Sequence, residues 1–141
     1  MGPMTPDKPQ ETQSKEPGVD PLLVRPGGLS YLEIPATDAR QSAAFYERVL
    51  GWKVSGTDTD QPRFSDPAGH LIGKWIVGRT PSPEPGLLPY FYVEQLKDII
   101  KRVLPYGGEI VKAVYREGTL WVAVIRDPAG NIIGLWQDSE R

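Results

Sequence analysis

Residues 66–75 read Asp-Pro-Ala-Gly-His-Leu-Ile-Gly-Lys-Trp, and residues 127–136 read Asp-Pro-Ala-Gly-Asn-Ile-Ile-Gly-Leu-Trp. Seven of the ten positions are identical at an offset of 61 residues. Two shorter repeats precede these copies in the same order, residues 29–34 with 88–93 and residues 48–50 with 102–104. Matching segments at spacings of about 50–60 residues indicate one supersecondary unit that occurs twice. The surface that two such units share is where we expect a ligand.

The composition narrows the class of protein. A length of 141 residues favours one domain that can bury a core without a metal or disulfide. The net charge of −2 and pI near 5.4 predict no nucleic-acid partner. The absence of cysteine excludes disulfides and thiolate chemistry and fits a reducing compartment. With no apolar run of about 20 residues and no hydrophobic signal core, we expect a cytoplasmic protein with no membrane partner.

The chain divides into a leader and one domain. Residues 1–27 are rich in proline and polar residues, which predicts a disordered leader that is either an inert tail or a segment that docks through Leu22–Val24. We expect a single domain over residues 28–138, with module one at 28–78 and module two at 87–138. The proline-containing segment between them reads as a linker.

Each module shows the same order of predicted elements. In module one, Asp38 is placed to cap a helix that Gly51 ends, with Gln41 three residues after the cap. Strands are predicted at 29–34, 52–55, 63–65 and 71–77. Module two repeats this order, with apolar helix positions at 96, 99, 100 and 103 and strands at 88–93, 109–115, 119–126 and 132–137. The prediction is an α+β fold of two tandem βαβββ modules.

Three segments carry a family resemblance: Phe45–Trp52, Tyr106–Gly108 and Asp127–Asn131. They resemble the vicinal-oxygen-chelate superfamily, which includes glyoxalase I, extradiol dioxygenases and bleomycin-resistance proteins. Glu33-Ile34-Pro35 and Gly134-Leu135-Trp136 are similar to a branch of glyoxalase-related proteins without an assigned reaction. The resemblance implies that the modules form a curved mixed sheet around a cavity, and that two copies form a homodimer.

In metal-dependent members of the superfamily, ligands come from the first and last strands of each module and are usually His and Glu. The resemblance carries these positions onto the following residues: Tyr31, Leu88 or Tyr90, Gly73 or Lys74, and Gly134. None is a good ligand for a divalent cation. The single histidine, His70, follows a turn and reads as a surface or capping residue. We therefore expect no metal and no other cofactor, which argues against glyoxalase I and dioxygenase chemistry.

Alternation along the strands predicts what faces the cavity. Tyr31 and Glu33 share one face of the first strand, and Tyr90 and Tyr92 share the equivalent face of its copy. Gly73 lies with Trp75 in one closing strand, and Gly134 with Trp136 in the other. If the geometry of the superfamily holds, the cavity is an aromatic pocket in which two glycines leave room. The expected ligand-binding residues are Tyr31, Trp75, Tyr90, Tyr92 and Trp136. The alternative is that these rings fill the core.

Glu33 is the candidate catalytic residue. A carboxylate on an inner strand face is costly unless it is paired or protonated, so Glu33 could act as a general base. The alternatives are a hydrogen bond to a tyrosine or an ion pair with a nearby cation (Lys74, Arg63 or Arg126). Tyr92 occupies the equivalent place in module two, so the repeat builds no pair of carboxylates.

Three functions compete. The leading hypothesis is a metal-independent small-molecule-binding protein that holds a planar or aromatic ligand in the cavity between the modules. The second is a glyoxalase-like lyase or isomerase with Glu33 as acid or base. The third is an interaction module whose cavity is filled by side chains.

Overall fold

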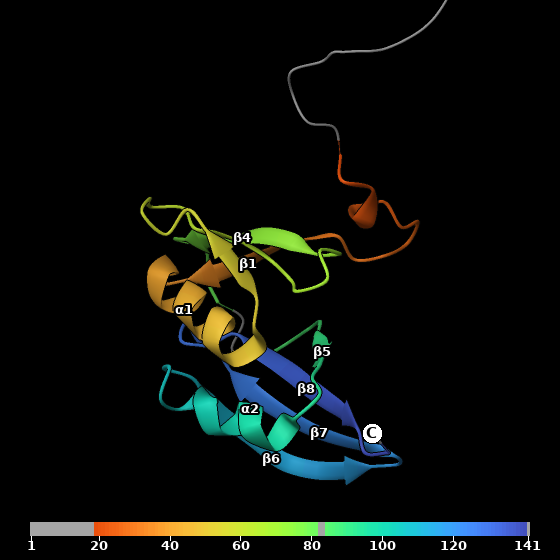
Figure 1. Cartoon of the computed structure of the whole chain (residues 1–141). Coiled ribbons are helices and arrows are strands. Elements are labelled where there is room, and N and C mark those ends of the chain that lie inside the picture. Colours follow the sequence, from red (N-terminus) through yellow and green to blue (C-terminus); the bar gives the residue numbers. More distant parts are fainter. Residues whose placement is uncertain (1–18, 82–83, 141) are drawn as a thin grey trace, which may run out of the picture.

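A computed structural model describes residues 19–81 and 84–140 (Figure 1). A short 3-10 helix, η1 (Pro21–Leu23), precedes module one. The elements of module one are β1 (Tyr31–Ala36), α1 (Ala39–Leu50), β2 (Lys53–Ser55), β3 (Arg63–Ser65) and β4 (Ile72–Val77). Those of module two are β5 (Tyr90–Tyr92), α2 (Leu96–Val103), β6 (Glu109–Glu117), β7 (Leu120–Arg126) and β8 (Ile132–Asp138). The predicted order, βαβββ twice, is confirmed.

The helix boundaries follow from local hydrogen bonding. Asp38 accepts hydrogen bonds from the backbone N–H groups of Arg40 and Gln41, at 3.0 and 3.1 Å, which caps α1. Gly51 ends the helix in the left-handed conformation at φ 73°, where glycine has no Cβ penalty. At the start of α2 the amide oxygen of Gln137, from β8, accepts from Leu96 N–H at 2.9 Å. A distant side chain therefore replaces a local cap.

Each module forms its own four-stranded mixed sheet. The strand orders are β1-β4-β3-β2 and β5-β8-β7-β6, with the first and last strands of each module paired in parallel. The other neighbours are antiparallel. The fold class is therefore the glyoxalase/bleomycin-resistance fold with tandem modules.

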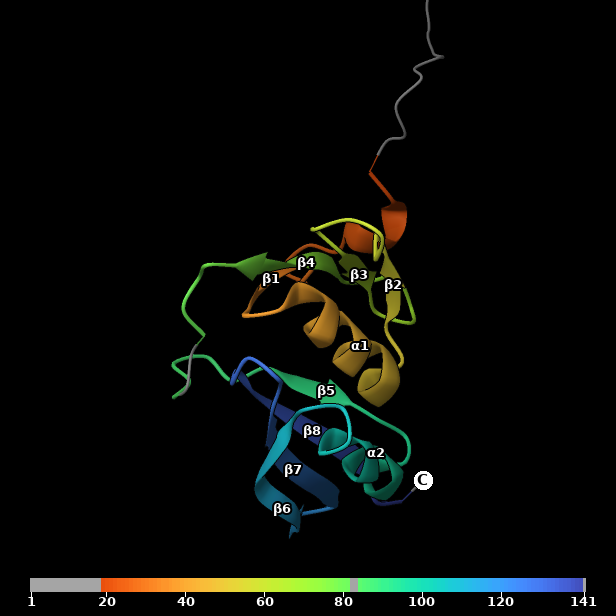
Figure 2. The ribbon, with the colours of Figure 1, turned by 90° about the vertical axis from the view of Figure 1, so that its left-hand side faces the viewer.

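The helix α1 lies at the centre of the molecule, and α2 packs on the second sheet. Figure 2 shows α1 between the first sheet and module two, and α1 also contacts α2. The inner faces of both sheets pack on these helices and supply the core. Its aromatic centre is continuous: Trp52 stacks on Tyr46 at 4.7 Å and on Phe64 at 4.5 Å between ring centroids. Each sheet keeps a second, outer face that the helices do not cover.

The turn before the last strand differs between the modules. Asp66 N–H donates to the Leu71 carbonyl at 2.9 Å, whereas Asp127 N–H donates to the Asn131 carbonyl at the same distance. The turn of module one is therefore one residue longer, and His70 is the additional residue. Because side chains alternate along a strand, residues at equivalent positions of the repeat point to opposite faces of their sheets after this turn.

The predicted leader lies mostly outside the described residues, which begin at residue 19. Within residues 19–27, Asp20 caps η1 by accepting from Leu22 N–H at 3.0 Å. The Arg25 guanidinium donates to the Leu29 carbonyl at 2.8 Å. Leu22 lies beside Gly69 in the β3–β4 turn.

Candidate functional site

The outer face of the second sheet carries exposed aromatic rings. Tyr90 pairs with Gly134, and Tyr92 pairs with Trp136, so all four residues share one face. The Tyr92 and Trp136 rings meet edge to face with 4.9 Å between centroids. Tyr90 is 47% exposed and Tyr92 44%. Large rings this exposed are available for stacking on a ligand or partner.

A hollow of about 410 Å³ lies on this face. Tyr90 and Trp136 line it together with Leu120, Val122 and Glu117. Gly134 was expected to leave room for a ligand, but the Tyr90 ring already fills the space that a Cβ at this position would need. Gly134 therefore accommodates the Tyr90 ring, and the hollow lies beside Tyr90 and Trp136.

Sequence reasoning missed further members of this face. Tyr115 pairs with Val122, and the Lys112 ammonium lies 4.0 Å from the centroid of the Tyr115 ring. Two register shifts in β6, between residues 110 and 112 and between 112 and 115, interrupt the simple alternation. Nothing in the sequence marks these bulges, so the face of Tyr115 could not be inferred from spacing.

The outer face of the first sheet is cationic. Across its strands, Tyr31 pairs with Ile72 and Glu33 with Lys74, while Arg63 pairs with Lys74 in turn. A hollow of about 320 Å³ opens there beside Tyr31, Lys53 and Arg63. Tyr31 is 43% exposed. The structure therefore keeps Tyr31 and Glu33 together, on a sheet separate from the Tyr90, Tyr92 and Trp136 cluster.

Trp75 does not join either outer face. It pairs with Ile34, is 2% exposed and packs 4.9 Å from Phe64 and 5.9 Å from Tyr46 between ring centroids. The expectation that Gly73 and Trp75 share the face of Tyr31 and Glu33 was wrong. The longer turn at His70 places Trp75 toward α1, although its sequence counterpart Trp136 points away from α2.

Glu33 is neither buried nor unpaired. Its carboxylate lies 2.9 Å from the Arg79 guanidinium, and its side chain is 37% exposed. An ion pair was among the alternatives for this residue, but Arg79 is not one of the cations expected for it. The desolvation on which the general-base hypothesis depended is absent in a single copy of the chain.

A buried polar network joins the two modules behind these faces. The Tyr46 hydroxyl of α1 donates to the Asp127 carboxylate at 2.8 Å. The Asn131 side-chain amide donates to the same carboxylate at 2.8 Å and to the Pro35 carbonyl at 2.7 Å. Burial raises the pKa of Tyr46 well above its usual value, and the charge and hydrogen bond of Asp127 add to the effect. Tyr46 is therefore a neutral donor, and its hydrogen bond links α1 of module one to the β7–β8 turn of module two.

Within residues 19–81 and 84–140, no group of three or more His, Cys, Asp or Glu side chains is placed to hold a metal ion. The positions implied for metal ligands carry Tyr31, Gly73 or Lys74, Leu88 or Tyr90, and Gly134. His70 lies in the β3–β4 turn, with its carbonyl 3.4 Å from Arg25. Among the same residues, no helix is long and apolar enough to cross a bilayer.

Comparison with known proteins establishes the family. Residues 31–135 match the model of the glyoxalase-like domain. A glyoxylase-like domain-containing protein of Didymella fabae is 31% identical over 103 residues, which are 68% of this chain and 80% of that protein. The chain therefore belongs to the glyoxalase-like domain family, within the vicinal-oxygen-chelate superfamily.

Solved structures of similar fold include proteins with different roles. A glyoxalase/bleomycin resistance protein/dioxygenase family enzyme from Burkholderia phytofirmans PsJN is 18% identical with a TM-score of 0.64, covering 77% of this chain and 97% of that one. A glyoxalase family protein from Bacillus cereus is 19% identical with a TM-score of 0.62, covering 90% and 99%. An antibiotic-binding protein, TnmS3, from Streptomyces sp. CB03234 is 19% identical with a TM-score of 0.59, covering 79% and 96%. At these identities the similarity shows the fold alone.

Proposed function

We propose that this protein is a cytoplasmic, metal-independent small-molecule-binding protein that holds a planar or aromatic ligand against Tyr90, Tyr92 and Trp136. The observation that carries the proposal is the exposure of Tyr90 and Tyr92 on the face that they share with the half-buried Trp136, beside a hollow that Leu120 and Val122 help to line. Rings held on a rigid sheet lose little entropy when a planar ligand stacks on them. The fold is also that of a protein described as antibiotic-binding, which supports a binding role.

We propose further that a second copy of this chain completes the site. The outer face of the first sheet presents Lys53, Arg63 and Lys74, whereas the corresponding face of the second sheet presents rings. Cations are attracted to the faces of aromatic rings, and the pairing of Lys112 with Tyr115 shows one such contact within the chain. In a two-fold dimer, module one of each copy covers module two of the other, which encloses two equivalent sites.

Ligand binding is tested by titrating planar probes, such as flavone and naphthol, and following tryptophan fluorescence. Tyr92→Ala removes an exposed ring from the proposed site, and we expect about tenfold weaker binding. Tyr106→Ala is the matched control, since Tyr106 is 38% exposed and lies after α2, away from the site. Equal affinities for the two variants, or no saturable response to any planar probe, would refute the binding site.

The dimer is tested separately by sedimentation over a range of protein concentrations. We expect a dimer that the double substitution Arg63→Ala and Lys74→Ala weakens, while Lys97→Ala on α2 leaves it unchanged. A chain that stays monomeric at about 100 μM, a concentration at which a weak specific dimer forms, excludes the second copy from the site. In that case the fluorescence titration still decides whether one copy binds the ligand.

Catalysis by Glu33 is the alternative proposal, as the acid or base of a glyoxalase-like lyase or isomerase. One observation favours it: Glu33 lies on the face that the second copy would cover, so dimer formation would remove water from the Glu33–Arg79 pair. Turnover of a candidate substrate that survives in Glu33→Gln would remove this role from Glu33. Loss of turnover with unchanged ligand binding would support it.

A further inference from the structure

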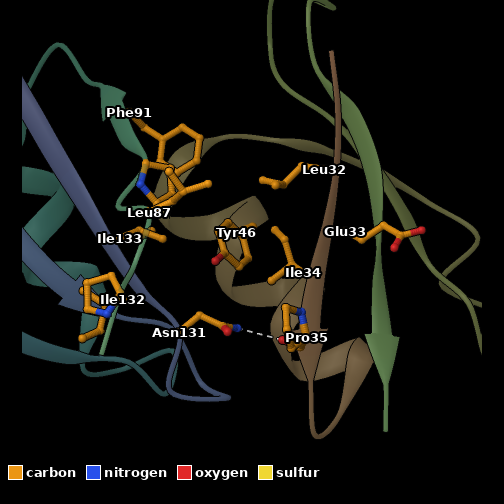
Figure 3. A pocket seen from close by; sticks show the side chains of 12 residues that line it. Leu32, Glu33, Ile34, Pro35, Tyr46, Leu87, Phe91, Asn131, Ile132 and Ile133 are labelled. Carbon is orange, nitrogen blue, oxygen red and sulfur yellow. Dashed lines mark hydrogen bonds between the residues drawn. The ribbon is translucent and has the colours of Figure 1, made fainter. Parts of the chain in front are cut away.

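A separate pocket lies between the two modules, inside a single copy of the chain (Figure 3). Leu32 and Ile34 of β1 and Tyr46 of α1 form one side, and Phe91 of β5 and Ile133 of β8 form the other. The volume of the pocket is about 140 Å³. None of the five aromatic residues expected at the ligand site lines it, so it is distinct from the proposed stacking face.

The polar groups around this pocket already have partners. The Tyr46 hydroxyl donates to Asp127, and the Asn131 amide donates to Asp127 and to Pro35. Glu33 contributes to the wall, but its carboxylate points to the opposite side of β1 in Figure 3 and pairs with Arg79. Among the described residues that line it, the pocket therefore presents mostly hydrocarbon, and the one charged side chain, Glu33, is turned away from it.

The mouth of the pocket is apolar as well. Pro85, Leu87 and Pro89 of the segment between the modules line it. Leu87 is 94% exposed, the highest value among the large hydrophobic residues of the described ranges. An occupant would cover part of this side chain, and removing apolar surface from water favours binding.

We propose that this pocket binds a small, uncharged monocyclic molecule of about the size of benzene. An enclosed apolar cavity of about 150 Å³ lined by Leu, Ile and Phe takes up benzene. This pocket is open on one side, but its volume is similar, and Leu32, Ile34, Phe91 and Ile133 supply apolar walls. Phe91 offers a ring to such a ligand and is itself held edge to face on Trp52 at 5.5 Å between centroids. The occupant contacts both modules, so it stabilises their packing.

Benzene is the direct probe. We expect its addition to produce saturable ring-current shifts in the methyl NMR signals of Leu32, Ile34 and Ile133, and to raise the midpoint of thermal unfolding. The methyl signals of Ile72 and Ile76, on the outer side of β4, should not move. Benzoate should bind at least about tenfold more weakly, because its charge would be buried without a partner.

Three variants separate this pocket from its surroundings. Leu32→Phe should abolish the shifts by filling the pocket, and Leu87→Ala should weaken binding several-fold at a position too exposed to affect folding. Leu104→Ala is the control, because Leu104 is 67% exposed and lies at the end of α2. Tyr92→Ala should leave benzene binding unchanged, which distinguishes this pocket from the stacking face.

Some results would overturn the proposal. These are the absence of saturable shifts at the solubility limit of benzene, shifts confined to the outer sheet faces, or equal binding of benzene and benzoate. Unchanged benzene affinity in both Leu32→Phe and Leu87→Ala would also overturn it.

Discussion

Replacing Tyr46 with phenylalanine tests whether the buried network at Asp127 holds the modules together. The substitution keeps the ring that stacks on Trp52 and removes only the hydroxyl that donates to Asp127 at 2.8 Å. The Asp127 carboxylate keeps its hydrogen bonds from the backbone N–H groups of Ala129 and Asn131 and from the Asn131 side chain. The variant should therefore fold, with a weaker connection between α1 and the β7–β8 turn.

The expected cost follows from the charge and burial of the acceptor. Hydrogen bonds to charged groups contribute about 1.5–3 kcal/mol, and Asp127 is 2% exposed, so water cannot replace the lost donor. We expect Tyr46→Phe to lower the free energy of unfolding by about 2 kcal/mol, which corresponds to a shift of about 1 M in the urea midpoint.

Urea unfolding monitored by circular dichroism measures this difference. Tyr106→Phe is the control, because Tyr106 is 38% exposed and its change should stay within about 0.5 kcal/mol. Two variants of equal stability would show that the hydroxyl–carboxylate bond contributes nothing. Apolar packing alone would then join the modules.

Three further outcomes are expected. Because the pKa of Tyr46 is raised in the folded protein, its hydroxyl contributes fully to stability below pH of about 10, which is the pKa of tyrosine in the unfolded chain. This contribution is lost as the pH rises toward the pKa of Tyr46 in the folded protein. Above pH of about 10, the urea midpoint should therefore fall less steeply with pH in Tyr46→Phe than in the native protein. Gly108→Ala should cost about 1–3 kcal/mol in thermal unfolding, since an added Cβ would lie 2.6 Å from both Phe45 Cε1 and the Arg126 carbonyl, whereas Gly86→Ala, with open space around it, should be neutral; equal costs would contradict this packing. Deletion of His70 should shorten the turn to the length of the module two turn while the Leu71 carbonyl still accepts from Asp66 N–H, so Trp75 should stay buried. The cost in stability should be no more than about 1 kcal/mol. Loss of cooperative unfolding would contradict the account of His70 as the additional turn residue.

Much of the fold could be predicted because its signals are local. The cap at Asp38, the glycine at the end of α1 and the alternating apolar positions each act within a few residues. Because the sequence of module two repeats that of module one, the same order of elements could be predicted there. The repeat could not, however, indicate which side chains point inward, because the identical Asp-Pro-Ala-Gly turns are followed by strands that differ in register by one residue.

The candidate site was harder to predict because it depends on sheet faces. Tyr90, Tyr92 and Trp136 were expected together and lie together, since one parallel pairing brings them onto one face. Trp75 was separated from them by the additional turn residue, and Tyr115 was missed because bulges in β6 interrupt its alternation. Arg79 could not be anticipated as the partner of Glu33, because it follows β4 in a segment without regular structure.

The most direct test of the proposed function follows the indole N–H signals of Trp75 and Trp136 by NMR while flavone or naphthol is added. Since Trp136 stands on the outer sheet face and Trp75 is 2% exposed in the core, the Trp136 signal should shift saturably and the Trp75 signal should stay in place. A saturable shift of Trp75 with Trp136 unmoved would contradict the assignment of the ligand face.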